Sequence, residues 1–357
     1  MRYRFWVAQA CLFLALLLTS GCTTGVLSCG PPVRGVKEAW PHDIGQYKHI
    51  VVVIEENKDP EDIFCRHCAP FLNKLAGEGA SFTQMFGEEH LSQGNYLWLF
   101  SGSNHGVGYF DSLRQSPIDA NNLGRALGKK GLGFTGYVES LPEDLSTGLS
   151  PPGCTFHDCV YGRKHVPWLS FSDFANDSQH TKSFEKSWPR DGRFDELPTV
   201  SFVVPNLNHD MHNPPDTRSV AAGDAWLEDN LGRYYEWAKK HNSLLIVTFD
   251  ENKATNFIGS TDPYASSGLE SPYLRARRNR IPTIFAGARI KHREGGYSEG
   301  KGITHVNILR TIEAMYDVDD VDISGGQQGC AAAAGITDRF IEDVFERSQP
   351  LTARPVR

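Results

Sequence analysis

A series of short apolar runs constrains the fold of this chain more than any other feature. The run from His49 to Ile54 is continuous and rich in β-branched residues, which is typical of a strand covered on both faces. Four further runs have the same character. They lie at residues 133–138, 199–204, 243–249 and 281–285. We therefore expect these runs to be strands inside a covered sheet.

Amphipathic segments lie between and after these runs. In the segment from Asp224 to Lys240, apolar residues recur at helical spacing, and Asp224 is a suitable cap. The residues at steps of four, three and four are Leu227, Leu231, Tyr234 and Ala238. Thr304 to Met315 predicts a second helix, capped by Thr304, and Pro70 to Leu75 predicts the start of a third.

Alternating strands and helices predict an α/β fold, a three-layer sandwich around a mainly parallel sheet. The chain has 357 residues, of which 40% are hydrophobic and 22% charged, so it can bury a large core. No internal repeat or second composition is present, and we expect one domain over residues 46–347. The net charge is −7 and no basic stripe occurs, which argues against a nucleic-acid partner.

The N-terminus has the pattern of an export signal. Arg2 and Arg4 precede an apolar run that ends at Leu18, and small residues lead to Cys22. Cys22 resembles the lipidated cysteine of a bacterial lipoprotein, although an ordinary cleaved signal is the alternative. Residues 23–45 are rich in Gly, Pro and Thr and predict a flexible tether. We expect an exported protein of the cell envelope, held to a membrane by an N-terminal lipid anchor.

The cysteines predict disulfides. Without Cys11 and Cys22, six remain, and an even number in an exported chain favours pairing. The Cys65-x-x-Cys68 pair has no second such pair to complete a zinc ribbon. Cys154 and Cys159 form a plausible local bridge, and the other pairings stay open.

Two acidic pairs follow predicted strands. Glu56-Asn57 ends the first run, and Asp250-Glu251 follows the run at 243–249. Either pair alone could be an exposed turn. Because the pattern occurs twice at strand ends, we expect these four residues to form a site for a divalent metal ion. Oxygen ligands leave magnesium, manganese, calcium and iron open.

Ser92 precedes an aromatic and leucine-rich segment, residues 96–100, that predicts a helix. At a helix start, backbone N–H groups and the helix dipole stabilise a phosphate, and a metal ion would lower the pKa of the serine hydroxyl. Serine is also an ordinary helix cap, which is the alternative. Taken with the acidic pairs, Ser92 is a candidate nucleophile for phosphoryl transfer.

Three polar segments supply further candidates. Asp210 and His212 follow the run at 199–204, and His305 begins the predicted helix after Thr304. Lys164-His165 precedes a Pro-Trp turn inside the long irregular segment 142–195, which we expect to line the substrate pocket. Each could contact a metal ion or a phosphate, or could be a solvated loop or a helix cap.

These segments together resemble the bacterial and fungal phosphoesterase family that includes acid phosphatases and bacterial phospholipases C, within the alkaline-phosphatase-like superfamily. The similar pieces run from His49 to about Val318. They include the first strand with Glu56-Asn57, the text His-Leu-Ser-Gln-Gly-Asn-Tyr at residues 90–96, and the strand that ends in Asp250-Glu251.

The resemblance implies a role for each matching position. Ser92 would be the nucleophile, with His212 and His305 as catalytic contacts to phosphate or leaving group. Asn95, Lys164, His165 and Asp210 would bind substrate. Glu56, Asn57, Asp250 and Glu251 would form the site of a divalent metal ion.

The chain departs from the family pattern near two of these positions. Leu91 and Gly94 replace prolines that stiffen the turn around the nucleophile, so we expect a looser position for Ser92. Lys58-Asp59 replaces a histidine or arginine followed by serine, which adds a charge pair near the metal site.

The sequence therefore predicts an exported, metal-dependent hydrolase of phosphoric esters, most simply an acid-phosphatase-type phosphomonoesterase that forms a phosphoserine. Phospholipase C or another phosphodiesterase is the alternative within the family. A lipid-anchored binding protein without catalysis is the alternative outside it. A sulfatase is disfavoured, because Ser92 lacks the Cys/Ser-x-Pro-x-Arg context.

Overall fold

A computed structural model describes most of the chain. The described residues are 31–35, 37–90, 92–107, 117–143, 145, 160–190, 192–214, 216–253, 279–291, 297–299, 302–318 and 325–348. Their centre is an eight-stranded sheet in the order β5-β4-β6-β1-β7-β8-β2-β9. A separate two-stranded sheet pairs β3 with β10.

The large sheet is mainly parallel. Its strands are β1 (His49–Glu55), β2 (Ala80–Phe82), β4 (Phe134–Val138), β5 (Thr181–Ser183), β6 (Val200–Val204), β7 (Ser243–Phe249), β8 (Thr283–Gly287) and β9 (Tyr297–Glu299). From β5 to β7 every neighbouring pair is parallel, whereas β8 runs antiparallel to β7 and β2. The small sheet consists of β3 (Met85–Phe86) and β10 (Ile303–Thr304). The predicted fold class is confirmed, and β7 begins and ends at the residues that the apolar run predicted.

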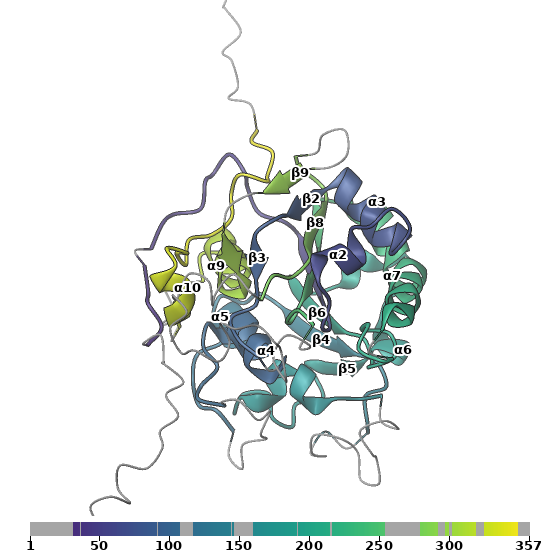
Figure 1. Ribbon diagram of the computed structural model, residues 1–357. Helices are drawn as coiled ribbons and strands as arrows, with labels where there is room; N and C mark the ends of the chain where they lie inside the picture. The colour runs from purple at the N-terminus through teal and green to yellow at the C-terminus, as the bar shows by residue number, and fades with distance from the viewer. Residues whose placement is uncertain are drawn as a thin grey trace, which may run out of the picture.

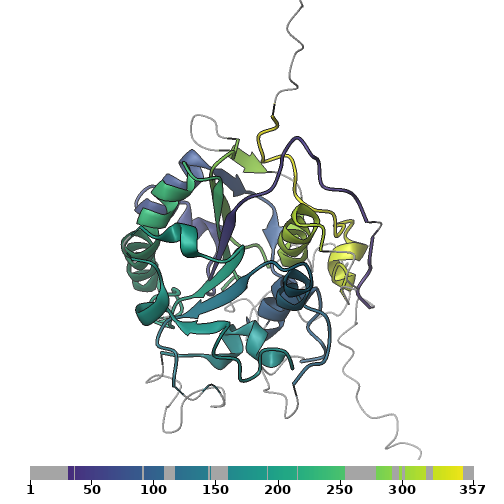
Figure 2. The same ribbon diagram turned by 180° about the vertical axis from the view of Figure 1, so that it is seen from behind.

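Helices cover both faces of this sheet (Figures 1 and 2). On one face α3 (Pro70–Glu78) packs against α7 (Thr217–Ala238). On the other face α4 (Ser92–Ser101) packs against α9 (His305–Met315) and α5 (Leu123–Lys129). The shorter helices are α2 (Pro60–Ile63), α6 (Phe184–Ser187) and α10 (Gly329–Ala333), with 3₁₀ turns η2 (Arg163–His165), η3 (Pro167–Ser170) and η4 (Phe194–Glu196). One cluster of buried apolar residues extends through the three layers.

The helix predicted from Asp224 begins earlier than expected. Asp216 is the cap of α7 and accepts a hydrogen bond from the Arg218 backbone N–H, so the prediction that Asp224 caps this helix was wrong. The Asp224 carboxylate instead accepts the backbone N–H groups of Phe71 and Leu72, each at 2.9 Å. Asp224 thus satisfies the first turn of α3, where Ala69 offers no side-chain acceptor.

The segment 142–195 is less irregular than expected. It contributes β5 to the sheet edge, where β5 pairs with β4, and it forms α6 and the three 3₁₀ turns. Trp168 of η3 is buried against Gly136 of β4, where a Cβ would lie 1.9 Å from the indole ring. The Trp168 indole N–H donates to Thr181 at 2.9 Å. These contacts hold η2, with Lys164 and His165, over the carboxyl ends of the central strands.

The N-terminal segment packs partly on the body. Trp40 and Ile44 belong to the part expected to be a flexible tether, yet both are buried in the core. Cys22 lies outside the described residues, and so does the Cys154–Cys159 pair. Cys65 and Cys68 form a disulfide. Among the described residues, no helix combines the length and the apolar character needed to cross a bilayer.

Candidate active site

The candidate site lies where β6, β1 and β7 end. These strands are adjacent and parallel, so the residues that follow them meet at one edge of the sheet. We call the resulting group of side chains the carboxylate site. It consists of Glu56, Asn57, Ser92, His165, Asp210, Asp250 and Glu251. Two of the predicted groups, the nucleophile and the metal set, therefore do come together.

Ser92 stands at the first position of α4, between two carboxylates. Its hydroxyl lies 3.2 Å from Glu56 Oε2 and 3.3 Å from Glu251 Oε1, and the side chain is buried. The other oxygen of Glu251 bonds to Nδ1 of His90. Of the two carboxylates that contact Ser92, Glu251 is thus held by His90, a histidine of the turn just before Ser92.

Glu56 is the centre of the site. The Tyr96 hydroxyl donates to Glu56 Oε1 at 2.5 Å, and the Tyr96 ring stacks on the His165 ring at 5.0 Å between centroids. Nε2 of His165 lies 3.2 Å from Glu56 Oε1 but does not have the geometry of a hydrogen bond. Tyr96 was not among the predicted residues. Its spacing of four from Ser92 in the predicted helix was the available signal, because such residues share a face.

Asp210 enters the site from the loop after β6. Its Oδ1 accepts the His212 backbone N–H at 2.8 Å, and its backbone oxygen accepts the Glu56 N–H at 2.7 Å. Its Oδ2 has no hydrogen-bond partner and lies 3.8 Å from Nδ1 of His165. Asp210 is fully buried. The free oxygen therefore faces Glu56 and His165 rather than solvent.

Asn57 and Asp250 link the ends of β1 and β7. Oδ1 of Asp250 accepts the backbone N–H of Asn57 at 3.1 Å and that of Glu251 at 2.6 Å. The Asn57 side-chain amide donates to Glu56 Oε2 at 3.0 Å. The remaining oxygens, Asp250 Oδ2 and Asn57 Oδ1, are buried without a partner. These hydrogen bonds fix the backbone after β1 and after β7, while Asn57 and Asp250 each keep one side-chain oxygen without a hydrogen-bond partner.

The ionisation of the site reflects burial and like charge. Burial, and then the neighbouring Asp210 carboxylate, raise the pKa of Glu56. Burial also raises the pKa of Asp250 and Asp210 well above their usual range, and the Glu56 and Glu251 carboxylates add to the shift at Asp250. Burial lowers the pKa of His165 well below its usual value. The folded protein alone thus disfavours several negative charges at this place.

A divalent cation fits these side chains. Glu56, His165 and Asp210 each offer a ligand atom, and the three atoms lie within 4.8 Å of one another. Neutral imidazole and carboxylate oxygen are common metal ligands, and four unsatisfied polar atoms lie here. These atoms are Asn57 Oδ1, His165 Nε2, Asp210 Oδ2 and Asp250 Oδ2. His165 and Asp210, predicted to bind substrate, are thus also possible ligands.

The other predicted residues lie around this centre. Both polar atoms of the Asn95 amide bond to the backbone of Glu89. His305 is fully buried, with Nδ1 2.6 Å from Glu88 and Nε2 2.7 Å from the Phe249 carbonyl oxygen. Asn95 and His305 therefore hold the loops of the site, and their contact with substrate stays a prediction.

His212 and Lys164 are only partly buried. His212 lies two residues after Asp210, and its Nδ1 lies 2.9 Å from the side-chain oxygen of Asn213. Burial lowers the pKa of His212, and the positive charge of Lys164 contributes to this shift. The same lysine acts against the rise in the pKa of Glu56. Both residues therefore lie beside the carboxylate site, and their contact with a phosphate ester stays a prediction.

Two buried charged residues near the site were not predicted as members. Glu55 faces away from Glu56 on β1, and neither of its carboxyl oxygens has a hydrogen-bond partner. Lys58 donates to the Met211 carbonyl oxygen at 2.6 Å. Lys58 thus holds the loop that carries Asp210, which goes beyond the added charge expected from its sequence position.

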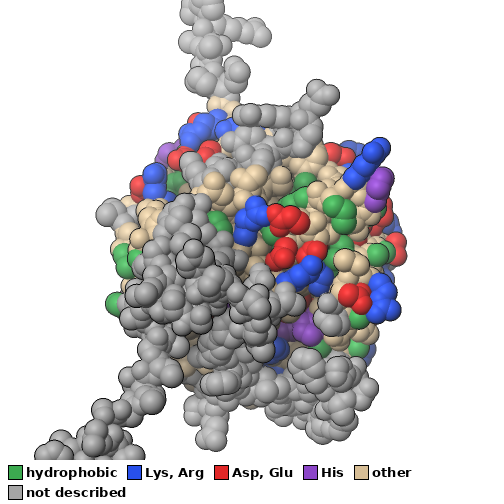
Figure 3. Space-filling model, viewed as in Figure 1, with side chains coloured by type: hydrophobic (Ala, Val, Ile, Leu, Met, Phe, Trp, Pro, Cys, Tyr) green, Lys and Arg blue, Asp and Glu red, His purple; other side chains and the backbone are tan. Residues whose placement is uncertain are grey.

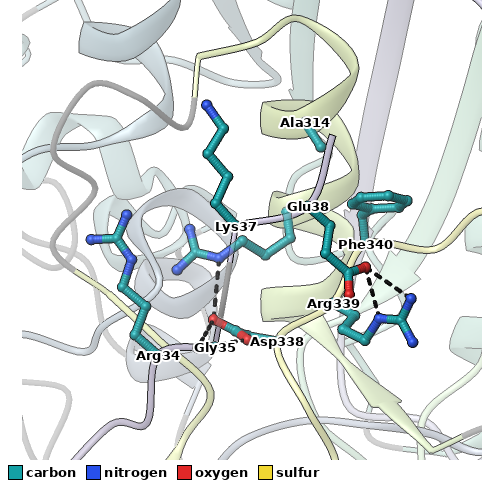
Figure 4. A pocket seen from close by; sticks show the side chains of 9 residues that line it. Arg34, Gly35, Lys37, Glu38, Ala314, Asp338, Arg339 and Phe340 are labelled. Atoms are coloured by element: carbon teal, nitrogen blue, oxygen red, sulfur yellow. Dashed lines mark hydrogen bonds and ion pairs between the residues drawn. The ribbon is translucent and has the colours of Figure 1, made fainter. Parts of the chain in front are cut away.

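Charged groups also gather at a pocket beside α9 (Figure 4), which we call the α9 pocket. It is lined by Arg34, Gly35, Lys37, Glu38, Arg310, Ala314, Asp338, Arg339 and Phe340. Arg339 pairs with Glu38 at 2.8 Å, and Arg310 lies 3.7 Å from Asp338. On the face drawn in Figure 3, acidic and basic side chains likewise lie next to one another. Opposite charges are mixed in these places, unlike in the carboxylate site.

The comparisons with known proteins point to one family. The sequence profile of the Phosphoesterase family matches residues 60–319. The chain is 38% identical to a phosphatidylinositol-3-phosphatase of Mycobacterium tuberculosis, over 76% of this chain and 77% of that protein. It is 26% identical to a phosphate-repressible acid phosphatase of Penicillium chrysogenum, over 73% of this chain and 57% of that protein.

The fold of this chain resembles the folds of solved structures. The crystal structure of the lipoteichoic acid synthase LtaP from Listeria monocytogenes matches with a TM-score of 0.51 and 13% identity, over 86% of this chain and 77% of that chain. A protein in the alkaline phosphatase superfamily from Vibrio parahaemolyticus matches with a TM-score of 0.45 and 15% identity, over 76% of this chain and 67% of that chain. The match to the synthase supports the α/β architecture alone.

Proposed function

Because this chain belongs to the Phosphoesterase family, we propose that its carboxylate site hydrolyses phosphate monoesters through a phosphoserine at Ser92. The family resemblance predicted from the sequence is confirmed, and the protein is a hydrolase that acts on phosphoric ester bonds. The type of ester, the covalent step and the cellular location are our proposals.

One observation carries the mechanism. The Ser92 hydroxyl stands at the N-terminus of α4 and within 3.3 Å of two buried carboxylates, Glu56 and Glu251. The helix start offers backbone N–H groups to a phosphoryl oxygen. The carboxylates offer acceptors for the serine proton.

A divalent cation would complete the site. A bound cation supplies positive charge to the phosphoryl oxygens and lowers the pKa of the serine hydroxyl. Glu56, Asn57, Asp250 and Glu251 would hold it, as the family resemblance implies. The unsatisfied atoms of His165 and Asp210 add two further donors on the opposite side of Glu56. These two residues either complete the same site or hold a second cation.

In the first step, Ser92 Oγ attacks phosphorus in line with the departing alcohol. The new bond joins Oγ to phosphorus, and the bond from phosphorus to the alcohol oxygen breaks. The serine proton passes to Glu56 or Glu251, the carboxylates in reach. His212 at the edge of the site could give a proton to the departing alcohol, and Lys164 could hold a phosphoryl oxygen.

In the second step, water attacks the phosphoserine. The bond from Ser92 Oγ to phosphorus breaks, inorganic phosphate leaves, and Ser92 regains a proton. The carboxylate that accepted the proton in the first step can return it here, and His212, which gave its proton to the departing alcohol, can take one from the attacking water. Asn95 and His305 hold the turn before Ser92 and the end of β7, and their direct contact with substrate stays a prediction.

The names of two relatives support a substrate class. One relative is a phosphatidylinositol-3-phosphatase and the other a phosphate-repressible acid phosphatase. We therefore infer a phosphate monoester, and a lipid anchor at Cys22 of an exported protein would place the enzyme at a membrane. Phospholipase C and other phosphodiesterase activity is the alternative, together with a binding protein that has lost catalysis.

The experiment is hydrolysis of p-nitrophenyl phosphate by purified mature protein, beside Ser92→Ala and a chelated sample. We expect turnover in the wild type, with a loss on the order of 10⁴-fold or more in Ser92→Ala, as for removal of other serine nucleophiles. Phosphatidylcholine and bis-p-nitrophenyl phosphate are run in parallel. Diester turnover without monoester turnover would favour the phosphodiesterase, and no turnover by folded protein with any divalent cation would favour the binding protein.

A further inference from the structure

Glu89, in the turn before Ser92, makes hydrogen bonds through its carboxylate, its backbone oxygen and its backbone N–H. Its carboxylate accepts the Trp98 indole N–H at 2.8 Å and the Asn104 amide at 2.8 and 3.1 Å. Its backbone oxygen accepts the amides of Asn95 at 2.6 Å and Asn279 at 2.8 Å. Its backbone N–H donates to Asn95 Oδ1 at 3.0 Å. Glu89 is thus bound to the start of α4, to its middle and to the loop that follows it.

Gly94 leaves the space that the Glu89 carboxylate occupies. A Cβ at position 94 would lie 2.2 Å from Glu89 Oε1, 2.7 Å from its carboxyl carbon and 3.1 Å from its Cγ. These distances are too short for real atoms in contact, so any side chain at 94 would displace the carboxylate.

The residues on either side of Glu89 make equivalent contacts to other elements. Glu88 accepts the Val306 backbone N–H at 3.1 Å and bonds to His305 at the start of α9. His90 bonds to Glu251 after β7. Three consecutive residues therefore tie α9, α4 and β7 to one turn, and the Glu89 link is the one that leads to the helix carrying Ser92.

We propose that Glu89 is a positioning residue that fixes the nucleophile through its contacts to α4. The inference rests on the proposed function, because it assigns Glu89 to the placement of Ser92 for attack. Glycine at 94 is required because the partly buried Glu89 carboxylate and a Cβ at position 94 cannot occupy the same space.

The test is a double-substitution cycle of Glu89→Ala and Gly94→Ala in the full mature protein. Gly94→Ala should lower kcat by about 10²-fold with little change in KM, since displacement of a reacting group by about 1 Å has an effect of this size. In the Glu89→Ala background, Gly94→Ala should cause no further loss, because the space is vacant and alanine is the better helix former. Glu89→Ala alone should lower kcat as well.

Gly128→Ala is the matched control. Gly128 lies in α5, and a Cβ added there would meet no heavy atom within 4 Å, so kcat and Tm should be unchanged or slightly improved. The midpoint of thermal unfolding, Tm, is recorded for every variant. Coupling between positions 89 and 94 in Tm tests the contact, and coupling in kcat at constant KM tests the placement of the nucleophile.

The remaining outcomes would each contradict the placement of the nucleophile by Glu89, the contact between Glu89 and Gly94, or the proposed function. Losses in kcat that simply multiply in the double variant would overturn the proposal, and so would a Gly94→Ala variant with wild-type kcat. Coupling in Tm without coupling in kcat would reduce Glu89 to a structural residue. If the wild type turns over no ester, the proposed function fails, whereas additive changes in Tm would separately overturn the contact between Glu89 and Gly94.

Discussion

The carboxylate site and the α9 pocket both concentrate charged residues, but they arrange the charges in opposite ways. In the α9 pocket each acid has a basic neighbour, such as Glu38 with Arg339 and Asp338 with Arg310. In the carboxylate site, Glu56, Asp210 and Asp250 are buried beside one another. Two of these three acids keep an oxygen without a hydrogen-bond partner.

This difference in charge pairing gives a physical criterion that distinguishes a structural group of charges from a functional one. Paired charges lower the free energy of the folded state or leave it nearly unchanged, and they need no ligand. Buried like charges with unsatisfied oxygens raise it, so they persist where a ligand compensates them or where reactivity depends on them. The carboxylate site meets this criterion, and the α9 pocket does not.

Among the substitutions that test this comparison, the largest effect is expected from a ligand of the carboxylate site. Asp250→Asn should lower kcat/KM by about 10³-fold, since loss of the metal ion raises the free energy of the transition state by several kcal/mol.

His165→Gln tests whether His165 and Asp210 are also ligands of the metal ion. A similar loss, reversed by raised divalent-cation concentration, would assign His165 to the metal ion. A smaller loss that appears only in KM would assign it to substrate.

A smaller effect, on stability, is expected at Glu55. Burial, and then the Asp210 carboxylate, raise the pKa of Glu55 well above its usual value. The folded protein therefore keeps this proton at a pH where the unfolded chain, with a glutamate pKa of about 4.3, has lost it. The stability that depends on this proton is fully present below that pKa and is lost as the pH rises.

Glu55→Gln should remove this dependence. The Tm of the variant should approach that of the wild type near pH 4.5 and exceed it by a growing margin up to pH 8, as followed by circular dichroism. The exposed Glu143→Gln is the control, with no such trend. A constant difference between Glu55→Gln and wild type across this range would mean that Glu55 is not held protonated.

The smallest effect is expected in the α9 pocket. Arg339→Ala breaks the pair with Glu38, whose members are 59% and 41% exposed. Exposed pairs contribute about 0–1 kcal/mol, so Tm should fall by a few degrees at most and kcat/KM should not change. A large loss of activity in Arg339→Ala would mean that the α9 pocket, like the carboxylate site, has a role in the reaction.

The strands could be predicted because their signal is local. The run 243–249 is apolar throughout, and β7 has these bounds. The start of α7 could not be predicted from Asp224, because that carboxylate caps a different helix through contacts to Phe71 and Leu72, more than 150 residues away in sequence. Local periodicity does not distinguish a cap of the same helix from a cap of another.

The candidate site divides in the same way. The residues after β1 and β7 could be predicted to meet, because parallel strands that carry them end at one edge of the sheet. The pairing of His90 with Glu251, 161 positions apart, could not. This pairing depends on where the turn before Ser92 lies relative to the end of β7, and no local pattern in the sequence records that distance.

The most direct test of the account is a calorimetric titration of metal-free protein with Mn²⁺ at pH 7, for the wild type, Asp250→Asn and the α9-pocket variant Glu38→Gln. Unpaired buried carboxylates at the carboxylate site predict saturable binding in the wild type and in Glu38→Gln, and greatly weakened binding in Asp250→Asn. No binding by the folded wild type, or equal binding in all three proteins, would contradict the central claim that this site is built to hold a cation.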